Sequence, residues 1–281
     1  MTRPLRVHAP GVAAHVVSRG DDKRPIFADA ADYEKYRALL ADGLRRFGVA
    51  CHMVCLLWNH LHLVLTPYEF PIWRLMQQVN SAYCQWFNVR HRRVGHVLQG
   101  RYGCRLIDDA SYFLNTIRYV ALNPVAAQKV ARAEDWPWGS YRALLGLDQM
   151  PAFLDTTELC RCLDAENESD MRVRLKTFVE AGDPAGGWRS LVTGSEAFAR
   201  RMDGLIAPHR YELDFSYADR YATRPPLATV LGGFSNEGLD VAIAEAFLKH
   251  GYTLRAIGDA LGGKHPSTIW RRIQRTLDRV S

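Results

Sequence analysis

The chain has 281 residues, with 36 lysines and arginines against 30 acidic residues, a net charge of +6 and a pI of about 9.0. Its composition, 48% apolar and 23% charged, is typical of a globular protein that folds in water. It contains no apolar run of about eighteen residues, the length a membrane-spanning helix needs, and "MTRPLRVHAPG" lacks the apolar core of a signal peptide. We therefore expect a cytoplasmic protein with no membrane partner and with reduced cysteines.

Basic charge is concentrated in two segments. Residues 90–105 carry five arginines and no acidic residue, and residues 249–281 carry seven lysines and arginines against two aspartates. A basic segment is most often an ordinary solvated surface. Two separate patches in a basic protein also suit two contacts with nucleic acid, and both interpretations stay open on charge alone.

Hydrophobic periodicity and turn residues predict the elements of the first half of the chain. In chain order they are a strand at 12–18, a helix from Asp29 to about Phe47, strands at 49–57 and 60–66 with a tight turn at Trp58-Asn59, a helix after Pro71, a strand at 100–107 and a helix from about Asp109. The last helix is expected to stop at Asn123, because Pro124 disfavours helical geometry in the residue before it.

This order of elements predicts an α+β fold, a ferredoxin-like antiparallel sheet covered by helices. We expect a first domain at residues 1–145, a helical extension and linker at 146–236, and a short helical domain at 237–281. The flexible stretches "GDPAGG" (182–187) and "LGGFSNEG" (231–238) indicate where the second half is interrupted.

Two histidines interrupt the apolar strand "HLHLVLT". Side chains alternate along a strand, so His60 and His62 share one face while the leucines between them face the core. Two imidazoles on one face can share a divalent ion, although a pair of half-exposed polar positions is the more common explanation.

The helix "SYFLNTIRYVALNP" carries a second polar pair. Tyr119 and Asn123 are four residues apart and therefore lie on one face. Taken locally, the tyrosine suits a helix surface and the asparagine suits a helix end. They gain a chemical meaning only beside a metal that activates a phosphate.

The segments "AAHVVSRGDDKRPIF", "CLLWNHLHLVL", "QGRYGCRLID" and "IRYVALNPVAA", in that order and spacing, resemble the IS200-like, single-tyrosine (Y1) transposases. Within them the chain is most similar to the REP-associated tyrosine transposases, over about residues 3–145. The resemblance implies that His60 and His62 form an HUH motif that holds Mg²⁺ or Mn²⁺, that Tyr119 is the nucleophile, and that Asn123 completes the metal site.

The resemblance also implies an activity and partners. A Y1 transposase cleaves and rejoins single-stranded or hairpin DNA, here at REP-like palindromes near the nucleoid, through a 5′-phosphotyrosine. A domesticated DNA-binding protein with a regulatory role is the alternative. A hydrolase that uses water would need further acidic ligands, which the sequence does not offer. Either a homodimer or a monomer is compatible with the sequence.

Several other residues enter these hypotheses. His52 is expected to be a packed polar residue, His96 could contact DNA, and Tyr112 and Tyr83 are the fallback nucleophiles. The arginines expected along the DNA path of the first domain are Arg19, Arg92, Arg93, Arg101 and Arg105.

The tail, residues 252–280, has the pattern of a helix-turn-helix with its turn at Gly262-Gly263. Its "IGDALGGKHPSTIWRRIQR" is similar to the C-terminal DNA-binding domain of the replication initiator DnaA. The buried positions would be Leu254, Ile257, Ala260, Leu261, Ile269, Ile273 and Leu277. The residues left for flanking duplex DNA would be Lys264, Ser267, Thr268, Arg271, Arg272 and Arg275. A packing helix pair with a basic exterior is the alternative.

Overall fold

The structure is a computed structural model, and it describes residues 8–182, 192–193, 195, 197–198, 200–202, 225–232, 236–248, 250 and 252–280. Two compact units divide the chain, one of Arg6–Ser195 and a second that contains Glu196–Ser281. Residues 146–182, which the sequence assigned to an extension, pack within the first unit. In the part of the chain that is described, no helix has the length and apolar character needed to cross a membrane.

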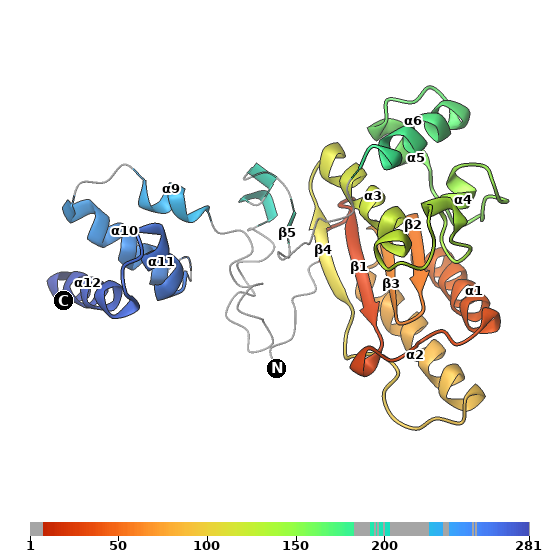
Figure 1. Cartoon of the computed structure of the whole chain (residues 1–281), viewed down its shortest axis with the longest axis horizontal. Coiled ribbons are helices and arrows are strands. Elements are labelled where there is room, and N and C mark those ends of the chain that lie inside the picture. Colours follow the sequence, from red (N-terminus) through yellow and green to blue (C-terminus); the bar gives the residue numbers. More distant parts are fainter. Residues whose placement is uncertain are drawn as a thin grey trace. The chain divides into compact units, whose positions relative to one another are not determined.

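The first unit is built around one sheet with the strand order β2-β3-β1-β4-β5. Neighbouring strands among the first four in this order are antiparallel, and β5 joins β4 in parallel. The predicted ferredoxin-like sheet is therefore confirmed, with one further strand at its edge (Figure 1). Its elements are β1 (Ala14–Arg19), the 3₁₀ turn Asp21–Lys23, α1 (Ala30–Phe47), β2 (Val49–Leu57), β3 (His60–Pro67), α2 (Ile72–Arg90), β4 (Gly103–Ile107), α3 (Ala110–Ala126), the 3₁₀ turn Ala133–Asp135, α4 (Tyr141–Leu144), α5 (Thr157–Cys162), α6 (Glu168–Glu180) and β5 (Val192–Thr193).

Helices cover both faces of this sheet. α1 and α2 pack together on one face, where Asn80 of α2 donates a hydrogen bond to Ser18 of β1. α3 lies on the other face against β2 and β3, and α5 and α6 pack on α3 (Figure 1). Phe113, Ile117 and Val120 of α3 are buried there. The face that carries α3 is the face of His60 and His62, since both histidines share their side of β3 with Val64 of the same core cluster.

The hairpin of β2 and β3 turns at Trp58-Asn59, as predicted, and pairs Leu57 with His60. A bulge at His52 shifts the register of β2. The His52 ring is buried and bonds the Thr66 hydroxyl (2.9 Å) and the Asp155 carbonyl (3.1 Å). His52 is thus the packed polar residue that the sequence predicted.

α3 extends further than predicted. It ends at Ala126 with Pro124 inside it, so the predicted end at Asn123 is wrong. Proline removes only its own N–H from the helical ladder, and the bias it places on its neighbour is not a prohibition. The next bond, from the Ala127 N–H to the Asn123 carbonyl, is formed at 2.9 Å.

The second unit is helical where it is described. It contains α9 (Leu227–Leu231), α10 (Asn236–Leu248), α11 (Leu254–Ala260) and α12 (Pro266–Val280). Ile257, Ile269 and Ile273 join residues of α10 in one apolar cluster. Ala260 is exposed, so its predicted burial is wrong, and the Leu277 side chain lies outside the described residues.

The turn between α11 and α12 needs its glycines. Gly262 and Gly263 have φ values of 81° and 77°, a region that side chains rarely adopt. The Gly258 carbonyl accepts the N–H groups of Gly263 and Lys264. A Cβ on Gly258 would lie 2.1 Å from the Lys264 carbonyl oxygen, so α11 and the turn after it meet backbone to backbone at this point.

Candidate active site

The two histidines of β3 lie on the sheet face that α3 covers, and β1 adds a third. Strand register pairs Arg19 with His60, Val17 with His62 and His15 with Val64. His15 therefore shares the face of His62 and lies diagonally across from it. The ring centroids of His60 and His62 are 5.0 Å apart, and those of His15 and His62 are 5.1 Å apart.

His60 is oriented by its neighbours. Its Nδ1 lies 2.7 Å from the Asn59 Oδ1, an acceptor, so Nδ1 carries the proton and donates it. In the neutral ring Nε2 then holds a lone pair, and it points at the Asn123 Oδ1, 3.4 Å away. Two electron-pair donors that face one another in this way suit a cation that both can bind.

The two ring nitrogens of His62 have different surroundings. Its Nδ1 lies 2.9 Å from Nε2 of His15. Its own Nε2 is buried and has no hydrogen-bond partner among the described residues. A buried polar atom without a partner is costly, so its presence indicates a ligand that supplies the missing interaction.

Burial keeps these imidazoles neutral. It lowers the pKa of His15 to about 3, with a smaller effect from the Arg105 charge. Burial also lowers the pKa of His62 well below its usual value, with the same direction of effect from His15, His60 and Arg105. Burial lowers the pKa of His60 too. Asn123 has a smaller, opposite effect and raises the pKa of His60 and of His62. A neutral imidazole is the form that ligates a metal.

Tyr119 completes the cluster from α3. Its half-buried ring stands edge-on to His62 and His15, with centroid distances of 5.7 Å and 5.8 Å. Asn123 lies one turn further along the same helix face, buried at 9% exposure. The four residues that the sequence singled out, from segments some sixty residues apart, therefore meet at one place.

The donor set fits a small divalent cation. Nε2 of His60, the unpartnered Nε2 of His62 and Oδ1 of Asn123 supply two nitrogens and one oxygen. Within the described residues, no cluster of three or more histidine, cysteine or acidic side chains could hold a metal ion.

The family model described as "Transposase IS200 like" matches residues 9–123, a range that contains His60, His62, Tyr119 and Asn123. Residues 9–123 therefore match the IS200-like transposase family, and we call this part of the chain the transposase domain. Among solved structures, the chain is similar to that of a REP-associated tyrosine transposase bound to a REP hairpin. The sequence identity is 14%, the match covers 55% of this chain and 92% of that one, and the TM-score is 0.45. The comparison with curated proteins found no match.

One residue of the transposase domain was missed by the sequence reasoning. His15 stood in the quoted segment "AAHVVSRG", but nothing local relates it to His62, 47 residues away. Only the antiparallel pairing of β1 with β3 brings the two rings together. The available signal was a histidine in a valine-rich strand, on the same side of the strand as Val17 and Arg19.

The fallback nucleophiles of the transposase domain are less suitable than Tyr119. Tyr83 is a fully buried residue of α2, and its hydroxyl donates to the Ile26 carbonyl. Burial raises the pKa of that phenol. Tyr112 lies near the start of α3, seven residues before Tyr119, and is absent from the ring contacts of the histidine cluster.

The arginines predicted along the DNA path occupy different surroundings. Arg19 is exposed and opposite His60, and its carbonyl accepts the Gln99 N–H (2.8 Å), so the segment before Arg101 runs beside the site. Arg105 pairs with His15 in the β1–β4 register. Arg92 and Arg93 follow α2, with Arg93 5.6 Å from the Phe87 ring centroid.

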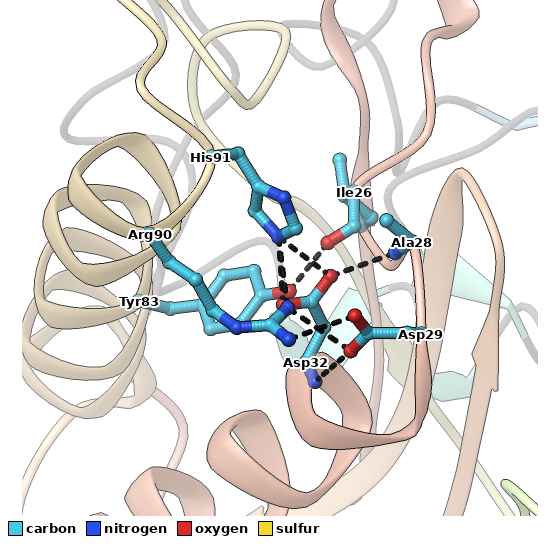
Figure 2. A network of polar contacts seen from close by, with 7 residues as sticks. All are labelled: Ile26, Ala28, Asp29, Asp32, Tyr83, Arg90 and His91. Atoms are coloured by element: carbon cyan, nitrogen blue, oxygen red, sulfur yellow. Dashed lines mark hydrogen bonds and ion pairs between the residues drawn. The ribbon is translucent and has the colours of Figure 1, made fainter.

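A buried carboxylate anchors the start of this arginine-rich segment (Figure 2). Asp32 of α1 has no exposed side-chain surface, and it accepts hydrogen bonds from Arg90 (2.7 Å), His91 (2.9 Å) and the Ala28 N–H (2.7 Å). Arg90 also pairs with Asp29 (2.7 Å). Arg90 thus holds the end of α2 on α1, which fixes the start of the segment that carries Arg92 and Arg93.

The residues predicted to read duplex DNA lie just before α12 and along its first ten residues. Lys264, Ser267, Arg271 and Arg275 are exposed, and Thr268 is half-buried. Arg272 differs from the expectation that it is left for DNA, because its guanidinium is paired with Asp240 of α10. Position 272 follows buried Ile269 by three residues, which turns it toward the neighbouring helix.

Proposed function

We propose that the chain is a metal-dependent tyrosine transposase that cleaves and rejoins single-stranded or hairpin DNA. The observation that carries this proposal is the meeting of Tyr119, His60, His62 and Asn123 on one face of the sheet. Tyr119 contacts His62, His62 lies beside His60, and His60 points at Asn123, so a nucleophile and three metal-binding side chains adjoin one another.

His60, His62 and Asn123 would hold the cation, Mg²⁺ or Mn²⁺, which when bound polarises the scissile phosphate and offsets the charge that develops on it. His15 and Asn59 fix the ring orientations of the two histidines through their Nδ1 atoms. Arg19 and Arg105, on the same sheet face, attract the DNA backbone to this place.

Tyr119 is the nucleophile in this proposal. Its hydroxyl oxygen forms a bond to phosphorus, the bond from phosphorus to the 3′-oxygen breaks, and the phenolic proton leaves to solvent while the 3′-oxygen gains one. The product is a 5′-phosphotyrosine and a free 3′-hydroxyl. A second 3′-hydroxyl reverses the step and rejoins DNA without ATP, because the covalent link keeps the energy of the phosphodiester.

Tyr119 and the histidines belong to one chain, and their rings are already in contact. This favours a tyrosine that acts in cis within one protomer. We further propose REP-like palindromes as the targets, on the strength of the motif resemblance, and the nucleoid as the place of action.

The second unit is proposed as a separate reader of duplex DNA. Its support is a pair of described helices, α11 and α12, joined by a glycine turn; α12 exposes Arg271 and Arg275, and Lys264 and Ser267 lie near its start. In this arrangement the tail binds flanking duplex while the transposase domain acts on the unpaired strand or hairpin.

The test is covalent trapping on a labelled single-stranded hairpin with Mn²⁺. Wild type should give a protein–DNA adduct that survives denaturation, and Tyr119→Phe should give none while it binds the hairpin with unchanged affinity. Tyr112→Phe, on the same helix, is the matched control and should keep the adduct. An adduct that persists in Tyr119→Phe would overturn the assignment.

A further inference from the structure

Trp58 is an exposed indole at the rim of the active site. It occupies the turn between β2 and β3, two residues before His60, and keeps 37% of its surface exposed. Leu57 before it and Leu61 after it are completely buried. A large aromatic side chain in such a place is not required by the core of the sheet.

The turn that carries Trp58 is held firmly. The Trp58 carbonyl accepts the N–H groups of Ile26 (2.8 Å) and Phe27 (3.1 Å). The next residue is fixed as well, since the Asn59 carbonyl accepts the Gly20 N–H (2.8 Å) and its side chain donates to the Lys23 carbonyl (3.1 Å). The indole is therefore presented from a fixed backbone, and the same backbone positions His60.

A cation lies over this ring. Nζ of Lys129 is 5.4 Å from the Trp58 ring centroid. The position of Lys129 follows from the way α3 ends. Gln128 takes a φ of 55°, and the Lys129 N–H donates to the Pro124 carbonyl (2.9 Å), which is the 6→1 hydrogen bond of a Schellman motif. Lys129 thus sits just beyond Asn123, at the same end of the site as Trp58.

The residues around the Trp58 ring indicate what kind of ligand it would bind. Arg19, opposite His60, and Lys129 make this rim positive, which suits a polyanion. The two neighbours of Trp58 in the chain, Leu57 and Asn59, are buried, so the exposed apolar surface at the turn is one indole, too small for a protein interface. An indole beside a cation suits a nucleobase, which can stack on the ring while its phosphate meets the ammonium.

We propose that Trp58 stacks an unpaired nucleobase next to the scissile phosphate and that Lys129 contacts the adjoining backbone phosphate. The inference rests on the proposed function, because it assumes that single-stranded DNA enters this site. It adds a contact that would hold the strand in place beside Tyr119 whatever the base sequence, since every base has a face that can stack.

The experiment uses the full chain with Tyr119→Phe as the parent, which removes cleavage. Binding is measured by fluorescence anisotropy to a labelled oligothymidine of about 16 nucleotides, a usual upper site size for single-strand binding. A second probe has the same length and phosphates but abasic sugars throughout. The probes therefore differ only in the bases.

Trp58→Ala should weaken binding to oligothymidine by roughly tenfold, and Trp58→Phe should retain most of the affinity. On the abasic probe, Trp58→Ala should bind like the parent. Lys129→Gln should weaken binding to both probes alike and lower the salt dependence by about one phosphate contact. Tyr68→Ala, which removes an aromatic that is 55% exposed at the far end of β3, should change nothing.

Two outcomes would overturn the inference: Trp58→Ala that binds oligothymidine like the parent, or Trp58→Ala that loses equal affinity for both probes. Rescue by Trp58→Phe with an unchanged melting temperature separates stacking from a folding defect. If the parent itself binds neither probe, the proposed function fails instead.

Discussion

Nε2 of His15 lies 2.9 Å from Nδ1 of His62, and the two rings stack with an angle of 18° between their planes. Only one proton can lie between these nitrogens. If it sits on Nδ1 of His62, that atom donates to His15 and Nε2 of His62 keeps a lone pair for a metal. With the proton there, His15 is the acceptor that holds His62 in the tautomer able to bind a metal through Nε2, the atom that has no partner among the described residues.

The first prediction follows from this contact. His15→Leu removes the acceptor and should weaken Mn²⁺ binding by about 10- to 100-fold, the usual effect of losing a residue that orients a metal ligand. His15→Gln keeps a carbonyl acceptor and should retain more of the affinity. The measurement is the free Mn²⁺ signal in electron paramagnetic resonance during titration of the protein.

His52→Gln is the control for that titration, because His52 is as buried as His15 but bonds Thr66 and the Asp155 carbonyl instead. Its Mn²⁺ affinity should match wild type. Equal affinities of the His15→Leu, His15→Gln and wild-type proteins would show that His15 does not position His62.

The second prediction concerns the stability of the first unit at mildly acidic pH. Burial lowers the pKa of His15, His52, His60 and His62. The unfolded chain binds protons at these rings below about pH 6.5, whereas the folded chain binds them only at lower pH. The free energy of unfolding therefore has its full value above this pH. It falls as the pH drops, by up to about 1.4 kcal/mol per pH unit for each ring.

This slope can be measured by urea unfolding at pH 5, 6 and 7 with tryptophan fluorescence. In a Trp270→Phe background, every remaining tryptophan belongs to the first unit. Aspartates and glutamates titrate mainly below this window, so histidines dominate it. His15→Gln removes one ring and should reduce the slope between pH 5 and 6. A stability that stays constant from pH 7 to 5 would contradict the prediction.

Local patterns in the sequence placed His60 with His62, and Tyr119 with Asn123, on common faces, because alternation in a strand and a four-residue spacing in a helix are short-range properties. Only the resemblance to the Y1 transposases related the two pairs to each other. Local patterns could not locate His15, whose relation to His62 depends on which strands pair and in which register. The same limit applied to Arg272. The residue looked available on its own helix, and only the packing of α12 on α10 gives it Asp240 as a partner.

The third prediction tests the buried carboxylate of Figure 2. Asp32→Asn would leave Arg90 and His91 without the charge that both contact, and it should destabilise the first unit by about 2–3 kcal/mol. Asp29→Asn is the matched control. Asp29 binds the same guanidinium, but half of its side chain is exposed, so the loss should be smaller because water screens the pair.

Thermal unfolding of both variants measures the difference. Asp32→Asn should also loosen the segment after α2, since Arg90 and His91 hold its first residue to α1. Hydrogen exchange of the amides in residues 91–100 should therefore become faster in that variant. Equal melting temperatures for the two variants would mean that the buried position gives Asp32 no special role.

The fourth prediction separates the arginines of α12. Arg271 and Arg275 are exposed, one helical turn apart, whereas Arg272 is paired with Asp240. Arg271→Gln and Arg275→Gln should each weaken binding to a labelled duplex and reduce the slope of affinity against salt by about one. Arg272→Gln, the same change on the same helix, should instead lower thermal stability and leave that slope unchanged. If the double variant of Arg271 and Arg275 keeps the wild-type slope in anisotropy titrations over a potassium chloride series, the helix does not bind the phosphate backbone, and the second unit is a packed helical unit with a basic exterior.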